Sequence, residues 1–538
     1  MRHCWLAALV IAEGCEGRTV KRLNKVFPIF TGRYAIKSSL YGKFQRKGFS
    51  TVASANTGIN GGVAEVSERE QDIKHYIWPD KKRPRVCIVG GGFGGLYTAL
   101  RLESLIWPDG KKPQVTLIDQ SDRFVFKPML YELLSGEVDE WEIAPRFSEL
   151  LANTEVQFIQ DRVKLLHTND MPTSGGQRNP CAGSVQLESD LLIEYDWLVL
   201  ALGAEPKLDM VPGAVGYALP FSTFEDACKV NDKLKALERK YFGEGSPIRV
   251  IVVGCGYSGV ELAATVSERL KDKGIVQAIN VNNTICPSAP PGNREAALKV
   301  LSDRNVQLFL GYFVNAVKRA ADVEVLNQLT DEGNNGMQQD SKELVVEIQP
   351  AERGLQGQNL EADLVLWTVG NKPRLPQLEP SDKPHMLPLN GIGQAETDET
   401  LRVKGNPRIF ALGDSSALRD SSGKPLPPTA QVAFQQADFT GWNIWAAIND
   451  RPLLPFRFQN LGEMMTLGRY DAAVTPSFID GLTLEGPVGH AARKLAYLIR
   501  LPTDQHKIKV GLSWFTKEAI DSVANLQTTL TKVLSGSS

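Results

Sequence analysis

Short apolar runs that end at glycines recur along the chain. Residues 85–89 read RVCIV and lead directly into a glycine turn, and residues 249–253 read RVIVV and do the same. Short β-branched runs bounded by glycine favour buried strands, and a helix is expected after each turn. The pattern therefore predicts an α/β fold in which one strand–glycine–helix unit occurs twice.

Past residue 451 the hydrophobic pattern becomes that of amphipathic helices. Residues 490–501 mix apolar with basic side chains, and a second apolar stripe follows residue 514. The first group is Leu495, Leu498 and Ile499 among Arg493, Lys494 and Arg500, and the second is Ile520, Val523, Leu526, Leu530, Val533 and Leu534. Residues at this spacing share one face of a helix, which predicts an amphipathic C-terminal region.

The N-terminus has a different composition. Residues 1–50 carry ten Lys or Arg and two acids, Glu13 and Glu16, and residues 50–64 are rich in Ser, Thr, Ala and Gly. A basic, hydroxylated and acid-poor segment is typical of an organelle transit peptide, and a disordered basic arm is the alternative. A secretory signal is less favoured, because the apolar stretch is short and many charges follow it.

The composition of the whole chain excludes several classes. The 538 residues are 42% hydrophobic and 23% charged, typical of a globular protein with room for about three domains. The net charge of −2 gives no overall basic field, so we expect no nucleic-acid partner. The seven cysteines contain no CxxC pair and the six histidines have no metal-ligand spacing, so we expect no disulfide framework and no metal site. No apolar run approaches the roughly 20 residues that cross a bilayer.

The first glycine turn is a dinucleotide fingerprint. Residues 85–95 read RVCIVGGGFGG, in which Gly90, Gly92 and Gly95 fit G-x-G-x-x-G. In this motif the first glycine permits the tight turn, the second lets the backbone approach a pyrophosphate at the helix N-terminus, and the third lets the helix pack on the sheet. The next strand, QVTLID, ends in Asp119, an acid placed to hydrogen-bond ribose hydroxyls.

The second glycine turn repeats the fingerprint. Residues 250–264 read VIVVGCGYSGVELAA, with Gly254, Gly256 and Gly259 at the same spacing. One nucleotide held permanently and a second that visits it is the arrangement for moving a hydride from nicotinamide to flavin. We therefore assign FAD to the first turn and NADPH or NADH to the second.

No acid follows the second fingerprint. The strand predicted over residues 277–281 is followed by Asn282 and Asn283. A carboxylate at this place favours NADH and repels the 2′-phosphate of NADPH, so its absence predicts that NADPH is accepted at least as well as NADH. Arg294 is a candidate to approach the 2′-phosphate, although the sequence leaves its direction open.

Three further segments resemble the two-dinucleotide-domain flavoproteins of the glutathione-reductase type. They are DWLVLALGAEP (196–206), ADLVLWTVGNKP (362–373) and RIFALGDSSAL (408–418). The resemblance implies two Rossmann-like dinucleotide-binding domains. It also implies that Asp414 hydrogen-bonds the ribityl chain or pyrophosphate region of FAD; the alternative is a solvated turn residue.

Within that superfamily, residues 84–500 resemble the type II, or alternative, NAD(P)H:quinone oxidoreductases. FKPMLYELLSGEVDEWEI (126–143) resembles the family's segment beside the isoalloxazine, and TAQVAFQQA (429–437) resembles its A-Q-x-A-x-Q-Q helix start. The resemblance implies that Lys127 and Pro128 contact the flavin ring, that Gln431 lies by the flavin and the quinone head group, that Gln435 is a weaker quinone candidate, and that Glu261 relays protons.

Three of these side chains have a structural alternative. Glu261 could be favoured by the positive helix N-terminus, Gln431 could bond backbone groups at a helix start, and Lys127 could be a surface lysine. A lysine before proline inside an apolar stretch favours the functional role, because a cation stabilises an anionic reduced flavin.

The likeness narrows to the plant and algal C1 subgroup. It is carried by the asparagines after the second motif, the N-terminal extension and the run PSAPPGNREAALKVL (287–301). The resemblance implies a membrane quinone substrate, such as plastoquinone or a phylloquinone precursor like demethylphylloquinone. It also implies a homodimer and a chloroplast location, at the plastoglobule or thylakoid surface, with the mitochondrion as a second possibility.

A quinone with a long apolar tail requires the enzyme to reach a lipid surface. The C-terminal helix fits this peripheral membrane or lipid-droplet contact, with Trp514 and Phe515 at the headgroup boundary and Lys509, Lys517 and Lys532 near lipid phosphates. The alternative is a helix that packs on its own core or on a second subunit.

Other flavoproteins fit the sequence less well. Sulfide:quinone oxidoreductases need a redox cysteine in the later half of the chain, and no cysteine follows Cys286. Disulfide reductases need a CxxC pair. A soluble ferredoxin or monodehydroascorbate reductase shares the two fingerprints but is not expected to contain AQVAFQQ. A redox-dependent binding flavoprotein of the apoptosis-inducing-factor type is the alternative from another class.

These patterns predict six segments. They are a transit peptide and linker (1–64), a second linker (65–83), the first part of an FAD-binding domain (84–245), an NAD(P)H-binding domain (246–369), the second part of the FAD-binding domain (370–450) and a membrane-associating region (451–538).

Overall fold

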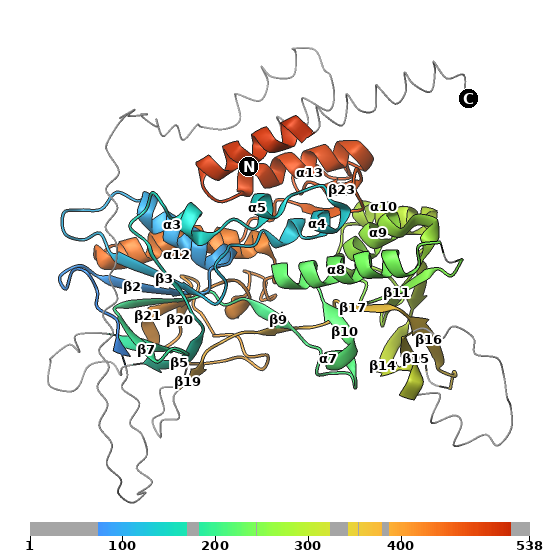
Figure 1. Cartoon of the computed structure of the whole chain (residues 1–538). Coiled ribbons are helices and arrows are strands. Elements are labelled where there is room, and N and C mark those ends of the chain that lie inside the picture. Colours follow the sequence, from blue (N-terminus) through green and yellow to red (C-terminus); the bar gives the residue numbers. More distant parts are fainter. Residues whose placement is uncertain are drawn as a thin grey trace, which may run out of the picture. The chain divides into compact units, whose positions relative to one another are not determined.

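Two largely parallel sheets carry the glycine fingerprints in the computed structural model (Figure 1). The structure describes residues 74–168, 182–243, 245–322, 343–352, 354–378 and 387–517. The predicted transit peptide and the apolar stripe at 520–534 lie outside these residues.

The first fingerprint lies in a six-stranded sheet. β2 (Arg85–Val89), α3 (Phe93–Ser104) and β3 (Gln114–Asp119) form the predicted strand–helix–strand unit. The strand order is β20-β21-β8-β2-β3-β4, and neighbours are parallel except β20 and β21. The other strands are β4 (Gln157–Gln160), β8 (Trp197–Leu200), β20 (Arg402–Val403) and β21 (Asn406–Ala411). Two segments that carried the resemblance thus provide adjacent strands, β8 and β21.

The second fingerprint lies in a five-stranded parallel sheet of order β10-β17-β11-β12-β13. Its elements are β10 (Ala218–Pro220), β11 (Ile248–Val253), α9 (Tyr257–Leu270), β12 (Gly274–Asn280), α10 (Pro291–Asp303), β13 (Gln307–Leu310) and β17 (Leu364–Trp367). Because β10 precedes residue 246, this sheet includes chain that the sequence assigned to the first FAD-binding part. The strand predicted over 277–281 is β12, which ends at Asn280.

Smaller sheets and helices surround these two. One sheet contains β1 (Lys74–His75), β7 (Leu191–Tyr195), β6 (Gly183–Leu187), β5 (Val163–Thr168) and β19 (Gln377–Leu378), and another contains β14 (Tyr312–Arg319), β15 (Leu344–Pro350) and β16 (Gln358–Ala362). β9 (Ala204–Pro206) and β18 (Asn371–Pro373) pair where the chain passes between the large sheets. α7 (Ala214–Tyr217), α8 (Phe224–Lys240) and η2 (Lys271–Lys273) complete this part.

The two segments expected beside the flavin are helical. Residues 127–150 form η1 (Lys127–Met129), α4 (Tyr131–Ser135), α5 (Glu140–Ile143) and α6 (Phe147–Leu150). The short η3 (Gly413–Ser415) precedes α12 (Ala430–Ile448), which begins where the Thr429 side chain accepts from the Val432 N–H. α12 packs along α3, and the Thr98 hydroxyl donates to the Ala437 carbonyl at 3.4 Å.

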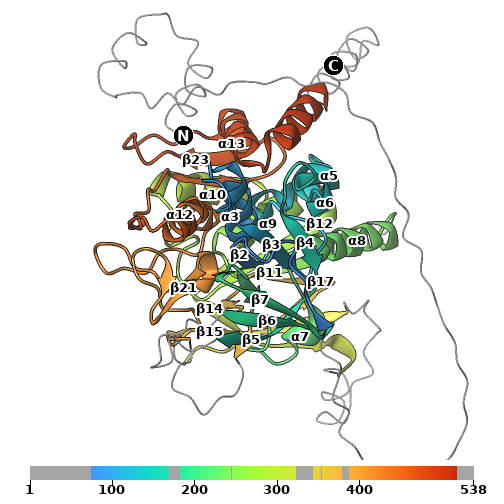
Figure 2. The same ribbon diagram turned by 90° about the vertical axis from the view of Figure 1, so that its left-hand side faces the viewer.

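The C-terminal region packs against the short helices. A hairpin of β22 (Glu463–Thr466) and β23 (Ala472–Thr475) leads to α13 (Gly486–Arg500), and residues 504–517 form a further helix. Figure 1 and Figure 2 show α13 and this last helix next to α5. Within the described residues, no helix combines the length and hydropathy needed to span a bilayer.

Two of the predicted lipid contacts are wrong. Trp514 is 6% exposed and belongs to the main hydrophobic core, and Lys517 pairs with the buried Glu142 carboxylate at 3.0 Å. An amphipathic stripe does not distinguish a face that packs on the core from one that faces lipid. The other predicted contacts are Phe515 and Lys509, which are exposed, and Lys532, which lies outside the described residues.

Candidate functional site

Both glycine turns adopt the same left-handed conformation. Gly90 has φ +99° and Gly254 has φ +100°, a region that favours glycine. A Cβ atom on Gly95 would lie 1.7 Å from the Gly90 carbonyl oxygen, and one on Gly259 would lie 1.8 Å from that of Gly254. The third glycine of each motif therefore lets its helix lie directly against the turn.

The middle glycines face open space. Gly92 and Gly256 are the N-cap residues of α3 and α9, and neither has an atom within 4 Å of an ideal Cβ. No side chain caps either helix, so the first N–H groups of each helix face a region with room for phosphate. Both turns therefore fit a dinucleotide pyrophosphate.

Asp119 is fixed at the end of β3 by backbone donors. Its Oδ2 accepts from the Gly91 N–H at 2.6 Å, and its Oδ1 accepts from the Ser121 N–H at 2.8 Å. Burial raises the pKa of this carboxyl, and the two hydrogen bonds oppose the shift. The acid thus lies against the first glycine turn, and its predicted contact with a ribose stays a prediction.

Asn280 is the counterpart of Asp119 in the second unit, in place of Asn282 or Asn283. The strand registers put Asp119 and Asn280 at the same position. The last residue of β2 pairs with Ile118 and the last residue of β11 pairs with Ile279, and the next residue is Asp119 or Asn280. The Asn280 Oδ1 accepts from the Cys255 N–H at 3.3 Å, which repeats the contact of Asp119 with its turn. Asn282 and Asn283 follow the strand and are exposed.

Arg294 lies near the second glycine turn. Its Nη2 donates to the Ala289 carbonyl at 2.9 Å, and its buried Nε has no hydrogen-bond partner. Burial raises the pKa of the neighbouring Cys286 thiol to about 12, and the Arg294 charge opposes that shift. The Cys286 N–H donates to the Cys255 carbonyl at 2.8 Å, which connects Arg294 to the turn; its contact with a bound phosphate stays a prediction.

Lys127 lies within electrostatic range of both Asp414 and Asp119. Crowding by protein atoms lowers the pKa of the Lys127 ammonium, and the Asp414 and Asp119 carboxylates oppose that shift. Burial raises the pKa of Asp414, and Lys127 opposes it. Lys127 is nevertheless exposed to solvent.

Gln436 supports the turn that carries Asp414, and the sequence analysis missed it. This side chain is 1% exposed, and its Oε1 accepts from the Gly413 N–H at 2.6 Å. Its place directly after Gln435 in AQVAFQQ was the available signal.

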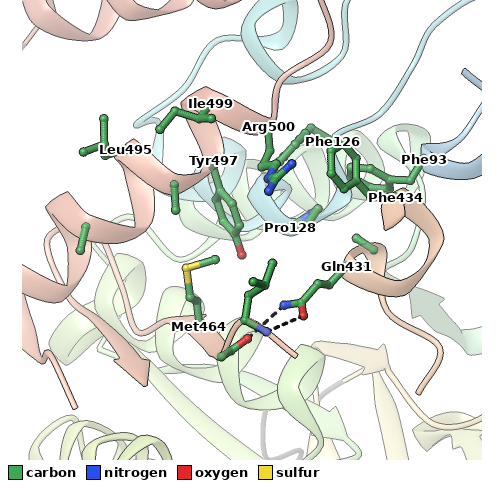
Figure 3. A pocket seen from close by; sticks show the side chains of 15 residues that line it. Phe93, Phe126, Pro128, Gln431, Phe434, Met464, Leu495, Tyr497, Ile499 and Arg500 are labelled. Carbon is green, nitrogen blue, oxygen red and sulfur yellow. Dashed lines mark hydrogen bonds between the residues drawn. The ribbon is translucent and has the colours of Figure 1, made fainter. Parts of the chain in front are cut away.

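The two glutamines expected near the quinone both bond the backbone. Gln431 donates from Nε2 to the Gly462 carbonyl at 3.1 Å and accepts at Oε1 from the Leu461 N–H at 3.0 Å (Figure 3). Gln435 bonds both backbone groups of Gln459, at 2.8 and 3.0 Å. Each amide retains a second N–H, so a contact of Gln431 with quinone stays a prediction.

An apolar pocket opens between α12 and α13 (Figure 3). Pro128 and Gln431, from the two segments that carried the family resemblance, lie on its wall together. Figure 3 shows Tyr497 pointing from α13 into the space between Gln431 and Met464. The complete lining is Phe93, Phe126, Pro128, Ala430, Gln431, Phe434, Leu461, Gly462, Met464, Ala492, Leu495, Ala496, Tyr497, Ile499 and Arg500.

Glu261 is buried and connects to this pocket through α13. It is 8% exposed, and its Oε1 accepts from the Thr466 N–H at 2.9 Å. Burial raises the pKa of Glu261 to about 7, and the charge of Arg493 opposes the shift. The Arg493 guanidinium lies 4.7 Å from the centre of the Tyr497 ring, which lines the pocket. A carboxyl that titrates near neutrality is suited to proton transfer.

Comparison with known proteins identifies the family. The sequence profile of the pyridine nucleotide-disulphide oxidoreductases matches residues 84–437. A protein of Arabidopsis thaliana named alternative NAD(P)H-ubiquinone oxidoreductase C1, chloroplastic/mitochondrial, is 69% identical over 479 residues, which are 89% of this chain and 89% of that protein. This chain belongs to the alternative, or type II, NAD(P)H:quinone oxidoreductases. The resemblance carried by 126–143 and 429–437 is confirmed.

Two further comparisons agree with this membership. Demethylphylloquinone reductase NdbB of Synechocystis is 41% identical over 443 residues, covering 82% of this chain and 98% of that protein. The structure of NDH2 from Plasmodium falciparum in complex with NADH has a TM-score of 0.62 at 18% identity, over 81% of this chain and 98% of that chain. This last likeness confirms the flavoprotein fold. As a family member, the enzyme uses a flavin and a pyridine nucleotide.

Proposed function

We propose that this oxidoreductase binds FAD, takes a hydride from NADPH or NADH, and delivers two electrons to a membrane quinone. The overall reaction consumes NAD(P)H, one proton and quinone, and yields NAD(P)⁺ and quinol. The observation that carries the proposal is the apolar pocket in which Pro128 and Gln431 meet, because a quinone head group and tail need a dry cavity beside the flavin.

The residues around the two turns have separate tasks in this proposal. Gly92 and Asp119 bind the pyrophosphate and adenosine ribose of FAD, and Lys127 and Asp414 hold its flavin half. When bound there, FAD would supply the two-electron acceptor for the hydride. Glu261 holds the proton that the quinone requires, and Gln431 offers its second N–H to a quinone carbonyl.

A short-chain quinone tests the function directly. Purified FAD-loaded protein should oxidise NADPH rapidly when quinone is present and slowly when it is omitted, as followed by absorbance of the nicotinamide. Oxidation that does not respond to quinone would favour a redox-dependent binding flavoprotein. Plastoquinone, ubiquinone and a demethylated naphthoquinone, compared as acceptors, identify the preferred quinone.

The coenzyme preference follows from Asn280. An uncharged side chain lies where Asp119 stands in the FAD unit, so nothing at this position repels a 2′-phosphate. Arg294, near the same turn, adds a positive charge. We therefore propose that NADPH is used at least as well as NADH.

Introducing the missing acid should change that preference. We expect Asn280→Asp to lower the NADPH:NADH ratio of kcat/KM about tenfold, or ~1.4 kcal/mol, by repulsion of the 2′-phosphate. Asn283→Asp is the matched control, because this exposed residue lies past the strand. An equal loss with both coenzymes in Asn280→Asp, or a tenfold NADH preference of the unmodified enzyme, would contradict the proposal.

The proton role of Glu261 predicts a pH dependence. With a pKa of about 7, the carboxyl is protonated below neutrality and loses its proton above it, so quinone turnover should fall on the alkaline side. Glu261→Gln should lower kcat by about 10²–10⁴-fold, the usual contribution of a general acid, and remove this alkaline limb. The measurement is kcat against pH at saturating quinone. A variant with full turnover at every pH would reject the role.

The last described helix offers a surface for peripheral attachment to lipid. On residues 504–517, Ile508, Leu512 and Phe515 are 64%, 63% and 72% exposed, while Val510 and Trp514 on the other face are buried. Exposed large apolar side chains at this spacing form one stripe, which is typical of an interfacial helix. The helix borders α13, since a Cβ on Gly511 would lie 3.4 Å from Leu498.

The location in the cell is proposed from the N-terminal sequence. Given the acid-poor N-terminus, we propose an organelle location: the chloroplast, at the plastoglobule or thylakoid surface, with the mitochondrion as the alternative. The name of the Arabidopsis relative mentions both organelles. Assembly as a homodimer is proposed from the family resemblance.

Removing the apolar stripe should release the enzyme from lipid. The triple variant Ile508→Ser, Leu512→Ser and Phe515→Ser should bind phosphatidylglycerol-containing vesicles at least about a hundredfold more weakly, because each side chain contributes ~1.5–3 kcal/mol when buried. Turnover of a short-chain quinone in solution should be unchanged. The control is Gln505→Ser with Thr516→Ser, two exposed polar positions of the same helix. Equal vesicle binding by both variants would argue against attachment through this helix.

A further inference from the structure

We propose that Glu132 is a positioning residue which, acting through Arg493, decides whether Glu261 keeps or releases its proton beside the quinone pocket. The inference deepens the proposed function and rests on it. Its basis is a buried Arg493–Glu132 ion pair whose two charges both act on Glu261. The neighbour of Glu132, Tyr131, lies against the helix that carries Glu261, with its hydroxyl 2.7 Å from the Ser258 hydroxyl.

Arg493 and Glu132 form an ion pair inside the protein. The arginine side chain is fully buried and that of Glu132 is 2% exposed. The Arg493 Nη1 donates to the Glu132 carboxylate, and its Nη2 donates to the Pro128 carbonyl at 2.6 Å. The pair thus links α13 to η1 and α4, and Pro128 is itself on the pocket wall.

Each member of the Arg493–Glu132 pair has one polar atom without a hydrogen-bond partner among the described residues. These atoms are the Nε of Arg493 and the Oε2 of Glu132, and both are buried. A buried donor and acceptor left open are costly, so such atoms usually bind an internal water or exchange between partners. The guanidinium therefore has a free N–H for a second acceptor.

Glu261 is the acid that competes for this cation. The titratable groups that face Glu261 are Tyr131 and Glu132 from α4, Arg493 and Tyr497 from α13, and Cys286 from the segment before α10. Arg493 is the cation in this set. Its charge lowers the pKa of Glu261, and the Glu132 charge raises it. A single buried cation cannot fully compensate two carboxylates. Because Arg493 is paired with Glu132, the protonated form of Glu261 is favoured.

This arrangement matches the proton balance of quinone reduction. The two electrons and one hydrogen nucleus come from the hydride of NAD(P)H, and one proton must come from solution. When Glu261 supplies that proton, its O–H bond breaks, a quinol O–H bond forms, and the carboxylate later takes a proton from water. Glu132 takes no part in these bonds and determines only how readily Glu261 gives and regains the proton.

The two members of the pair should shift the pH profile in opposite directions. Glu132→Gln removes the charge that holds Arg493, so the alkaline limb of kcat with short-chain quinone should move to lower pH. Arg493→Gln removes the cation, so the limb should move to higher pH. Shifts of about 1–3 pH units are expected for charges at such range. The double variant should lie between the two single ones.

Glu137→Gln is the matched control. Glu137 is also a buried carboxylate between α4 and α13, with its Oε1 2.9 Å from His490 Nε2 and 3.0 Å from Lys494 Nζ. It pairs with His490 and Lys494 and not with Arg493. Its substitution should therefore leave the position of the limb unchanged. A merely structural role would make Glu132→Gln and Glu137→Gln alike, or would move both members of the pair the same way, and either result would overturn the proposal.

Infrared spectroscopy gives a readout independent of turnover. The carbonyl stretch of a protonated buried carboxyl should titrate near neutrality in the unmodified holoenzyme, disappear in Glu261→Gln, and titrate at lower pH in Glu132→Gln. Arg493→Lys retains a cation if Arg493→Gln fails to fold, and it should keep the limb near its original position. If quinone stimulates NADPH oxidation but the carboxyl band titrates at the same pH in Glu132→Gln as in the unmodified enzyme, only the positioning role is rejected. If quinone does not stimulate oxidation by the unmodified enzyme, the proposed function itself is rejected.

Discussion

Pairing of buried carboxylates in residues 132–142 with cations of the two C-terminal helices is the constraint on which the functional region depends. Arg493 pairs with Glu132, Lys494 lies 3.0 Å from Glu137, and Lys517 pairs with Glu142, whose side chain is fully buried. Separating Arg493 from Glu132, both of which are buried, would leave an uncompensated charge in a dry interior, at a cost of about 3–5 kcal/mol. These pairs therefore hold the C-terminal helices against residues 132–142, and α13 in this position forms one wall of the apolar pocket.

The two nucleotide units show how one local device supports different tasks. Both turns use a left-handed first glycine, an open second glycine and a third glycine pressed against the turn. The difference lies at the last residue of β3 and of β12, which is the acid Asp119 in the first unit and the amide Asn280 in the second. At this position the two units thus differ by a single side chain on an otherwise repeated backbone.

The local parts of this description were predictable from the sequence, and the long-range parts were not. The strands, glycine turns and Asp119 follow from short-range pattern, because strand, turn and acid lie within one supersecondary unit. Asn280 was overlooked because Val281 extends the apolar run, although it is 56% exposed. The Arg493–Glu132 pair spans 361 residues, and periodicity carries no information about such a partner. For the same reason, Trp514 and Lys517 were assigned to lipid.

The glutamine contacts of α12 have a consequence for selectivity. The side-chain amides of Gln431 and Gln435 each form two hydrogen bonds with backbone groups of residues 459–462, much as a paired β-strand does. Few polar groups are then left to read the substituents of a quinone ring. An apolar cavity separates close analogues by only about 10–200-fold. A cavity of this composition would therefore accept a range of related quinones.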